Sequence, residues 1–403
     1  MRDTKNEKEL PICYKCDVAV VGGGVAGIAA ALSAARQGAK VALVEKQCVL
    51  GGLATSGLIT IYLPLCDGEG HQVSFGIAEE LFLLSVKYGA QRKYPKAWLE
   101  GGTLEERIAQ RFEVQFNPVY FQLLAEELLI ENGVDILYDT QVCDTLIEDG
   151  RLTGAIVENT DGRSVLKAKA FVDASGDARL FHMSGAATAT YARENILAAW
   201  YYSNQDGKLK LNRLGTIEES NCVVIDRQVD KPLSSRRFRG VEASEVNEFL
   251  LLSHRQMLFD MRKKRKELTD YEPAFIPGMP QFRMTRRMVG KYELGGNQYG
   301  EKMQDSIGMV ADWRRRGYIY EIPFGCLYSD ELKNVFAAGR NISADDEMWD
   351  VSRVIPACAV TGEAAGIAAV MSGKGEVSVE KLQNILREKG QKLHIEELDE
   401  IGN

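Results

Sequence analysis

Apolar and polar positions near the start of the chain follow the order strand, helix, strand. Residues 17–21 and 40–44 are short runs rich in valine, of the kind that is buried in a parallel sheet. An alanine-rich stretch from residue 25 to about residue 37 lies between them, and Gly38 is a typical residue to end a helix. The pattern therefore predicts a β-α-β unit with two neighbouring parallel strands.

The turn between the first strand and the helix carries three glycines at the spacing Gly-x-Gly-x-x-Gly. We expect Gly22 to permit the tight turn, Gly24 to let backbone amides approach a pyrophosphate, and Gly27 to let the helix pack closely on the sheet. Glu45 follows the second strand, where a carboxylate can accept hydrogen bonds from ribose hydroxyls and disfavours a 2′-phosphate. These features predict a dinucleotide site with the phosphates at the helix N-terminus.

A second signature lies near the other end of the chain. Residues 334–340 read as a strand that ends in Ala-Ala-Gly-Arg, and residues 351–366 include a helix with Pro356 in its first turn. The small residues of this helix would let it lie close to a cofactor or to the sheet, and its N-terminus would favour an anionic reduced flavin by about 0.3 to 2 kcal/mol. A flavin that extends beyond the first unit needs such a second segment, so the two signatures together predict FAD.

Four segments resemble the FAD-dependent oxidoreductase family of the glutathione-reductase-like superfamily. Residues 45–57 resemble the glycine-rich region after the dinucleotide fingerprint, and residues 171–177 resemble a strand that ends in Ala-Thr-Gly-Asp. Residues 282–292 resemble an arginine-rich motif, and residues 320–324 resemble the strand that enters the last flavin segment. The resemblance covers most of the chain and implies an α/β, Rossmann-like FAD-binding fold.

Three positions depart from the pattern of this family. Met284 stands where a glutamate usually separates the arginines, and Cys66 and Asp346 stand where relatives commonly have histidine. Chemistry that depends on those side chains cannot be carried over to this chain.

The motifs and the resemblance together define a predicted FAD site. Val142 is included because the resemblance places its backbone against adenine, although packing within a strand explains this valine equally well. Arg353 could contact flavin or a substrate carbonyl, although acidic residues nearby in sequence could neutralise it. The predicted cofactor-binding residues are Gly22, Gly24, Val25, Ala26, Gly27, Glu45, Lys46, Gly51, Gly52, Leu53, Ala54, Thr55, Val142, Ala174, Ser175, Gly176, Gly339, Arg340, Arg353 and Val354.

The order of segments predicts a FAD-binding domain that is discontinuous in sequence. Strands predicted between residues 135 and 172 resemble a β insert that covers the adenine end. We expect residues 1–184 and 322–403 to form the FAD-binding domain, a parallel sheet with this insert. Residues 185–321, with a helix near residues 243–266, are expected to form a smaller α+β substrate domain.

Three arginines are candidates for substrate binding. Arg283, Arg286 and Arg287 flank Thr285, and a guanidinium group binds a carboxylate through two parallel hydrogen bonds. The target would be an acid-bearing substrate or the electron-rich edge of the flavin. A surface strand with ion pairs worth about 0 to 1 kcal/mol each is an equally good explanation of the cluster.

Composition and charge restrict the partners. The chain has 403 residues, of which 45% are apolar and 26% charged, which is a normal mixture for a globular protein. The net charge of −8 argues against a general nucleic-acid surface. Residues 1–10 lack the apolar core of a signal peptide, and no run of about 18 apolar residues is free of charge. We expect a cytoplasmic protein without a membrane partner, and the sequence leaves homo-oligomerisation open.

Cysteine and histidine residues do not predict a metal site. The chain has 8 cysteines and 4 histidines. Cys13 and Cys16 form a Cys-x-x-Cys pair, but no second pair completes four ligands and the pair does not open a helix. The role of these two cysteines stays open.

The expected function is that of an FAD-dependent oxidoreductase. Hydride transfer at flavin N5 belongs to the cofactor, so a catalytic acid or base is optional. We expect oxidation or reduction of a small organic substrate, with a carboxylate as one option, and the electron acceptor is unknown. The alternatives are a protein whose flavin is structural or non-redox, and a dehydrogenase that binds only NAD.

Overall fold

The main sheet of this computed structural model, which describes residues 10–215 and 233–398, combines strands from both ends of the chain. Its order is β5-β2-β1-β8-β7-β6, and β16 pairs with β8 as well. The strands are β1 (Ile12–Val21), β2 (Val41–Val44), β5 (Asp135–Leu137), β6 (Gln141–Glu148), β7 (Arg151–Asn159), β8 (Gly162–Asp173) and β16 (Val335–Ala337).

The long strand β8 joins the two parts of this sheet. It runs parallel to β1 along most of its length, and its first half pairs with β7 in antiparallel register. Where β7 ends, β16 takes its place and runs parallel to the last residues of β8, with Val335 opposite Phe171. The predicted α/β fold with a discontinuous Rossmann-like sheet is therefore confirmed.

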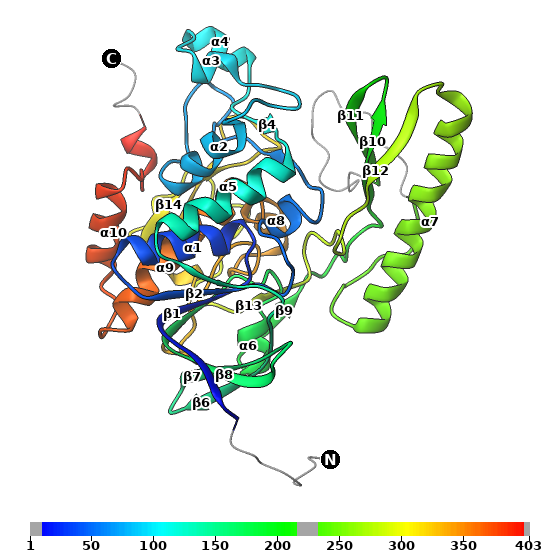
Figure 1. Ribbon diagram of the computed structural model, residues 1–403. Coiled ribbons are helices and arrows are strands. Elements are labelled where there is room, and N and C mark those ends of the chain that lie inside the picture. The colour runs from blue at the N-terminus through cyan, green and yellow to red at the C-terminus, as the bar shows by residue number, and fades with distance from the viewer. Residues whose placement is uncertain (1–9, 216–232, 399–403) are drawn as a thin grey trace.

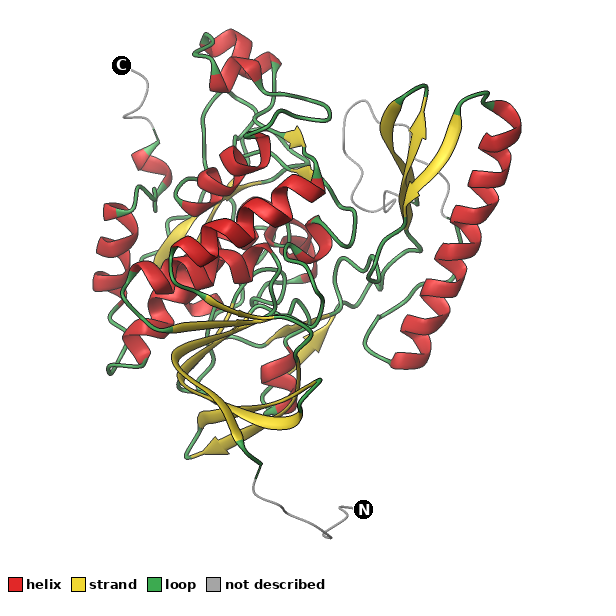
Figure 2. Ribbon diagram, in the orientation of Figure 1, coloured by secondary structure: helices red, strands yellow, loops and turns green. Residues whose placement is uncertain are grey.

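Helices cover one side of this sheet, as Figure 2 shows. Helices α1, α5 and α9 lie above β1 and β2 in the view of Figure 1. The helices are α1 (Val25–Arg36), α2 (Ile77–Val86), α3 (Lys96–Leu99), α4 (Leu104–Ala109), α5 (Pro118–Glu131), α6 (Arg179–Met183), α7 (Ala243–Glu267), α8 (Asp346–Ser352), α9 (Ile355–Ser372) and α10 (Val379–Glu388).

The small residues of α9 serve its contact with α1. A Cβ atom on Gly362 would lie 2.3 Å from the Ala26 carbonyl oxygen, and one on Gly366 would lie 2.1 Å from Ser33 Oγ. These glycines therefore allow the two helices to cross closely. Among the described residues, α9 is also the one helix that is long and apolar enough to cross a membrane, but a buried core helix meets the same criterion and 89% of α9 is buried.

The middle of the chain contributes to two regions. Strands β10, β11 and β12 form a small sheet that packs on α7 and stands to the right of the main body in Figure 1. Strands β14 and β15, by contrast, pair with each other beside α9. The domain limits 1–184, 185–321 and 322–403 stay a prediction. The remaining strands are β3 (Ile61–Tyr62), β4 (Val114–Gln115), β9 (Thr188–Thr190), β10 (Ala199–Gln205), β11 (Lys208–Leu214), β12 (Tyr271–Phe275), β13 (Arg286–Met288), β14 (Ser306–Ala311) and β15 (Ile319–Pro323).

The first strand begins earlier than the apolar pattern predicts. Strand β1 starts at Ile12, because its first half pairs with β8 although it is largely exposed. Cys13 and Cys16 therefore lie in a strand, where their thiols donate hydrogen bonds to the carbonyls of Val165 and Lys167 at 3.5 and 3.8 Å. Burial raises the pKa of Cys16 to about 12. Residues 1–9, on which the expectation about a signal peptide rested, lie outside the described residues.

Candidate active site

A cavity opens at the carboxyl ends of β1, β2, β8 and β16. In open α/β sheets, ligands bind at this edge. The predicted residues that line this cavity come from all four strand ends and from two helix N-termini. They are Gly22, Gly24, Val25, Ala26, Glu45, Lys46, Gly51, Gly52, Leu53, Ala54, Val142, Ala174, Ser175, Gly176, Gly339, Arg340 and Arg353.

Three predicted residues do not line the cavity. A Cβ atom on Gly27 would lie 1.8 Å from the Gly22 carbonyl oxygen, so this glycine serves the packing of α1 as predicted. Thr55 is buried beneath Gly51, whose own Cβ would lie 2.4 Å from it. Val354 precedes α9 as its N-cap residue.

One end of the cavity is built from backbone groups. Gly24 is the N-cap of α1, makes no side-chain cap, and a Cβ placed there would meet nothing within 4 Å. The amide of Gly51 donates to the Gly23 carbonyl at 2.8 Å, which joins the two glycine loops. The free amides of the first turn therefore face an open space that suits a phosphate group.

Glu45 fixes the first glycine turn. Its Oε2 accepts a hydrogen bond from the Gly23 amide at 2.6 Å, and its Oε1 accepts one from the Gln47 amide at 2.8 Å. A carboxylate has about four lone-pair sites, so Glu45 retains acceptor capacity toward the cavity that it lines. The predicted ribose acceptor thus also holds the turn that forms the phosphate site.

The N-terminus of α9 closes the other end of the cavity. The amide of Gly339 donates to Thr361 Oγ1 at 3.0 Å, and the first turn of α9 has no side-chain cap. Ile355 and Cys358 from this turn line the cavity. Burial raises the pKa of Cys358 to about 12, so its thiol stays neutral and donates a hydrogen bond to the Arg353 carbonyl.

Arg340 connects three parts of the chain around the cavity. Its Nε donates to the Gly176 carbonyl at 2.6 Å and its Nη2 to Asp177 Oδ1 at 2.8 Å, in the loop after β8. Its Nη1 donates to the Phe282 carbonyl at 2.6 Å. Arg340 lines the cavity as predicted, but these donors are directed at the protein, so its main role here is to hold the wall together.

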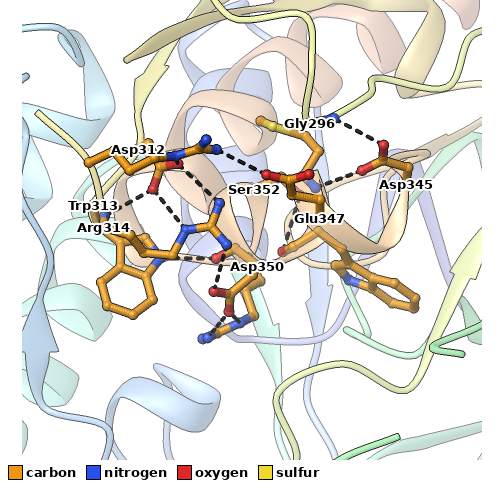
Figure 3. Close-up of polar contacts among 12 residues, drawn as sticks. Gly296, Asp312, Trp313, Arg314, Asp345, Glu347, Asp350 and Ser352 are labelled. Carbon is orange, nitrogen blue, oxygen red and sulfur yellow. Dashed lines mark hydrogen bonds and ion pairs between the residues drawn. The ribbon is translucent and has the colours of Figure 1, made fainter. Parts of the chain in front are cut away.

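Arg353 belongs to a buried network of charges. It pairs with Asp350 through Nε at 2.9 Å and through Nη2, so the neutralisation by a nearby acid is observed. Arg314 Nη1 lies 3.4 Å from Asp350 Oδ2, and Figure 3 shows Arg314 between Asp312 and Asp350. Burial alone would raise the pKa of Asp312, but Arg314 and Arg315 outweigh it and hold that pKa below its usual value.

The three arginines of the sequence cluster occupy different environments. Arg287 is buried and pairs with Glu293, away from the cavity. Arg286 lies near Arg179, and burial together with this neighbour lowers its pKa. Arg283 lies near Arg353 and Arg340, and burial followed by these two charges lowers its pKa to about 9. The structure therefore separates the predicted group, and none of the three lines the cavity. Arg283 lies near the lining residues Arg340 and Arg353, and Arg286 lies near the lining residues Asp177 and Arg179.

Several lining residues were not predicted. Asp177 and Ile355 lie within segments that the motifs had marked, so a signal for them existed. Met279 comes from a loop after β12, where Gly278 donates to the Ser56 carbonyl at 2.8 Å, and nothing local predicts that approach. The unpredicted lining residues are Val21, Val44, Gln47, Thr140, Gln141, Asp177, Arg179, Met279, Ala338, Ile355 and Cys358.

The cavity fits FAD. Its wall offers uncapped amides at two helix N-termini, an open space beside Gly24 and the Glu45 carboxylate. A family model described as FAD dependent oxidoreductase matches residues 17–199 and 191–394. The chain belongs to this FAD-dependent oxidoreductase family. It is therefore an oxidoreductase and a flavoprotein, and its membership of this family identifies FAD as its cofactor.

Individual relatives of this FAD-dependent oxidoreductase are distant. The digeranylgeranylglycerophospholipid reductase of Thermoplasma volcanium is 26% identical over 194 residues, 46% of each chain. A tRNA uridine 5-carboxymethylaminomethyl modification enzyme of Thermus thermophilus is 34% identical over 163 residues, 40% of this chain and 25% of that one. The match thus spans about half the length of the first of these curated relatives and less of the second.

Solved structures with a similar fold are also distant from this flavoprotein. A geranylgeranyl bacteriochlorophyll reductase-like protein from Thermoplasma acidophilum gives a TM-score of 0.45 at 14% identity, over 94% of this chain and 82% of that one. A flavoprotein/dehydrogenase from Cytophaga hutchinsonii gives a TM-score of 0.46 at 17% identity, over 91% and 81%.

Proposed function

We propose that this FAD-dependent oxidoreductase oxidises or reduces a small, carboxylate-bearing organic substrate by hydride transfer. When bound, FAD supplies the hydride acceptor or donor at N5. The glycine loops and the N-terminus of α1 would hold its pyrophosphate, and the first turn of α9 would lie at its ring end. The protein's own contribution is then to bind and orient the substrate near that end.

The observation that carries the proposal is that Arg283 makes no direct ion pair among the described residues, although the Asp350 carboxylate acts on it at longer range. Its arginine neighbours have carboxylate partners: Arg340 pairs with Asp177, and Arg353 pairs with Asp350. Within residues 10–215 and 233–398, no carboxylate forms an ion pair with Arg283, whose Nη1 donates only to the Gln281 carbonyl. A partly buried guanidinium that lies near two other arginines and has no direct ion-pair partner favours an anionic ligand, and a carboxylate fits its parallel donors.

The position of Trp200 also supports an anionic ligand beside Arg283. Its ring lies 5.0 Å from the guanidinium carbon of Arg283, and its buried indole Nε1 has no hydrogen-bond partner among the described residues. An indole N–H without an acceptor is costly in a folded protein. The unpartnered indole N–H beside a guanidinium that has no ion-pair partner favours a ligand rich in oxygen, such as a carboxylate.

The test compares Arg283→Met with Arg286→Met in the FAD-loaded enzyme, in a screen of small carboxylic acids and their uncharged amides. We expect wild type to reduce or oxidise an acid in preference to its amide. Arg283→Met should raise the KM for the acid by about 10- to 100-fold, because hydrogen bonds to charged groups are worth about 1.5 to 3 kcal/mol. Arg286→Met, which lies near Asp177 and Arg179 and not near Arg340 and Arg353, should raise the KM much less.

Two results would contradict the proposal. If Arg283→Met kept the preference for acids over amides, the carboxylate would be recognised elsewhere or not at all. If flavin bound stoichiometrically but neither dithionite nor any substrate reduced it, the alternative of a non-redox flavin protein would replace hydride transfer. The oxidant or reductant of the second half-reaction is left open, because no second Gly-x-Gly-x-x-Gly unit indicates a nicotinamide domain.

A further inference from the structure

Asp350 lies between two arginines that belong to different segments. It is the fifth residue of α8, is 2% exposed, and accepts Nε and Nη2 of Arg353 on its Oδ1. Arg314, from the turn after β14, approaches Oδ2 at 3.4 Å, and the Trp313 indole donates to the Asp350 carbonyl at 3.1 Å. The side chain is thus held from two sides, and Arg353 is tied to it at the cavity wall.

The charges around Asp350 balance. Asp312 accepts two hydrogen bonds from Arg314, at 2.9 and 3.0 Å, and one from Arg315 at 2.8 Å. Arg315 reaches Glu347 at 3.1 Å, and this carboxylate is partly exposed. The network therefore contains three carboxylates and three arginines, and it runs from the half-exposed Glu347 to Arg353 at the cavity.

We propose that Asp350 is a positioning residue, which fixes the guanidinium of Arg353 at the cavity wall and sets the net positive charge that the bound flavin experiences. The proposal rests on the proposed function only in placing Arg353 near the flavin, and it does not depend on the substrate. Charges buried at low dielectric act strongly over short distances, so one unmatched arginine would change the electrostatics of the wall. A more positive wall stabilises reduced, anionic flavin and raises its reduction potential.

The test measures the flavin reduction potential of the FAD-loaded protein by equilibration with dyes of known potential. Asp350→Asn keeps the shape and one acceptor oxygen but removes the negative charge, so the potential should shift upward. Arg314→Met removes a positive charge from the far side of Asp350, so the potential should shift downward. Glu321→Gln is the matched control: it neutralises a buried carboxylate, 2% exposed, whose partners outside this network are His394 and the amides of Met303 and Ile395.

The opposite signs of these shifts separate positioning from simple structural support. A merely structural Asp350 would lower the melting temperature and leave the potential of the folded, loaded fraction unchanged, and that result would overturn the proposal. If Asp350→Asn did not fold, an unchanged potential in Arg314→Met would overturn it in the same way. Failure of the substrate screen would not move these potentials, so the two proposals fail independently.

Discussion

The two ends of the cavity are lined by different chemical groups. At the end formed by α1 and the glycine loops, backbone amides face the ligand and few charges take part. At the end formed by α9, the wall contains Arg340 and Arg353, with Arg283 beside them. At the first end, an added methyl group at Gly24 should therefore have a large effect on ligand binding, whereas at the second end the charges of Arg283, Arg340 and Arg353 should decide it.

The largest expected effect comes from adding one carbon atom at the end formed by α1 and the glycine loops. Gly24→Ala places its Cβ in open space, so the free protein should keep its melting temperature while FAD binding weakens by about 1 to 3 kcal/mol, because the methyl group occupies the approach to the phosphates. Gly27→Ala pushes against the Gly22 carbonyl and should destabilise the free protein by about 3 kcal/mol. Calorimetry without FAD and a fluorescence titration with FAD measure the two effects.

The comparison of Gly24→Ala with Gly27→Ala can also contradict this prediction. Equal losses of stability in the two variants would mean that Gly24 also serves packing, and the distinction between the roles of the two glycines would be wrong.

At the charge-built end, acid binding should depend on pH. Burial and the neighbouring arginines lower the pKa of Arg283 to about 9, and the guanidinium is charged below that pH. The affinity for a carboxylate ligand should therefore be constant near neutral pH and fall by about tenfold per pH unit above about 9. Isothermal titration calorimetry between pH 7 and 10.5 would measure this fall in affinity. An affinity that stays level up to pH 10.5 would mean that Arg283 does not bind the carboxylate.

A carboxylate in the otherwise apolar helix α9 provides a third test. Burial raises the pKa of Glu363 from 4.5 to about 7, although the Gln391 amide and the Ile77 amide donate to it. Because the folded-state pKa lies above that of the unfolded chain, the folded protein binds this proton more tightly. The free energy of unfolding should therefore fall as pH rises from 4.5 to 7, by about 3 kcal/mol.

Glu363→Gln should abolish this part of the pH dependence and stabilise the protein most above pH 7. Urea unfolding at pH 5.5 and pH 8 measures the difference. A variant that loses the same stability at both values of pH would show that the hydrogen bonds of Glu363, and not its ionisation, dominate.

The smallest expected effect concerns the stability of Arg283→Met. The positive charge of Arg283 is partly buried and faces two other arginines, so replacing it relieves repulsion while its contact with Trp200 is lost. We expect the melting temperature to stay level or rise slightly, as is common when a functional charge is removed. A clear drop in melting temperature would indicate that Arg283 stabilises the fold. Its main role would then be structural.

Local patterns predicted the parts of the fold that depend on local structure. The unit β1-α1-β2, its glycine turn and Glu45 follow from periodicity and spacing, and α1 ends at Arg36, one residue before the expected limit. The start of β1 at Ile12 was missed, because this exposed half of the strand lacks the continuous valine-rich run of the buried half and is defined by its pairing with β8.

The charge-built end could not be predicted in detail. Proximity in sequence suggested that Arg283, Arg286 and Arg287 act together, but the chain directs them to three different environments. Met279 and the pairing of Arg340 with Asp177 depend on approaches between segments far apart in the sequence. Such long-range contacts produce no periodic pattern in the sequence, whereas a glycine turn can be recognised from the spacing of its glycines.

The place of β16 beside β8 also has a consequence for biosynthesis. Residues 335–340 and the start of α9 complete the cavity wall, yet they are synthesised after more than four fifths of the chain. During translation the glycine loops can form, but the α9 end of the wall is still missing and the edge of β8 that β16 covers is unpaired. Stable loading of the cofactor therefore requires that the chain be synthesised at least as far as the first turns of α9.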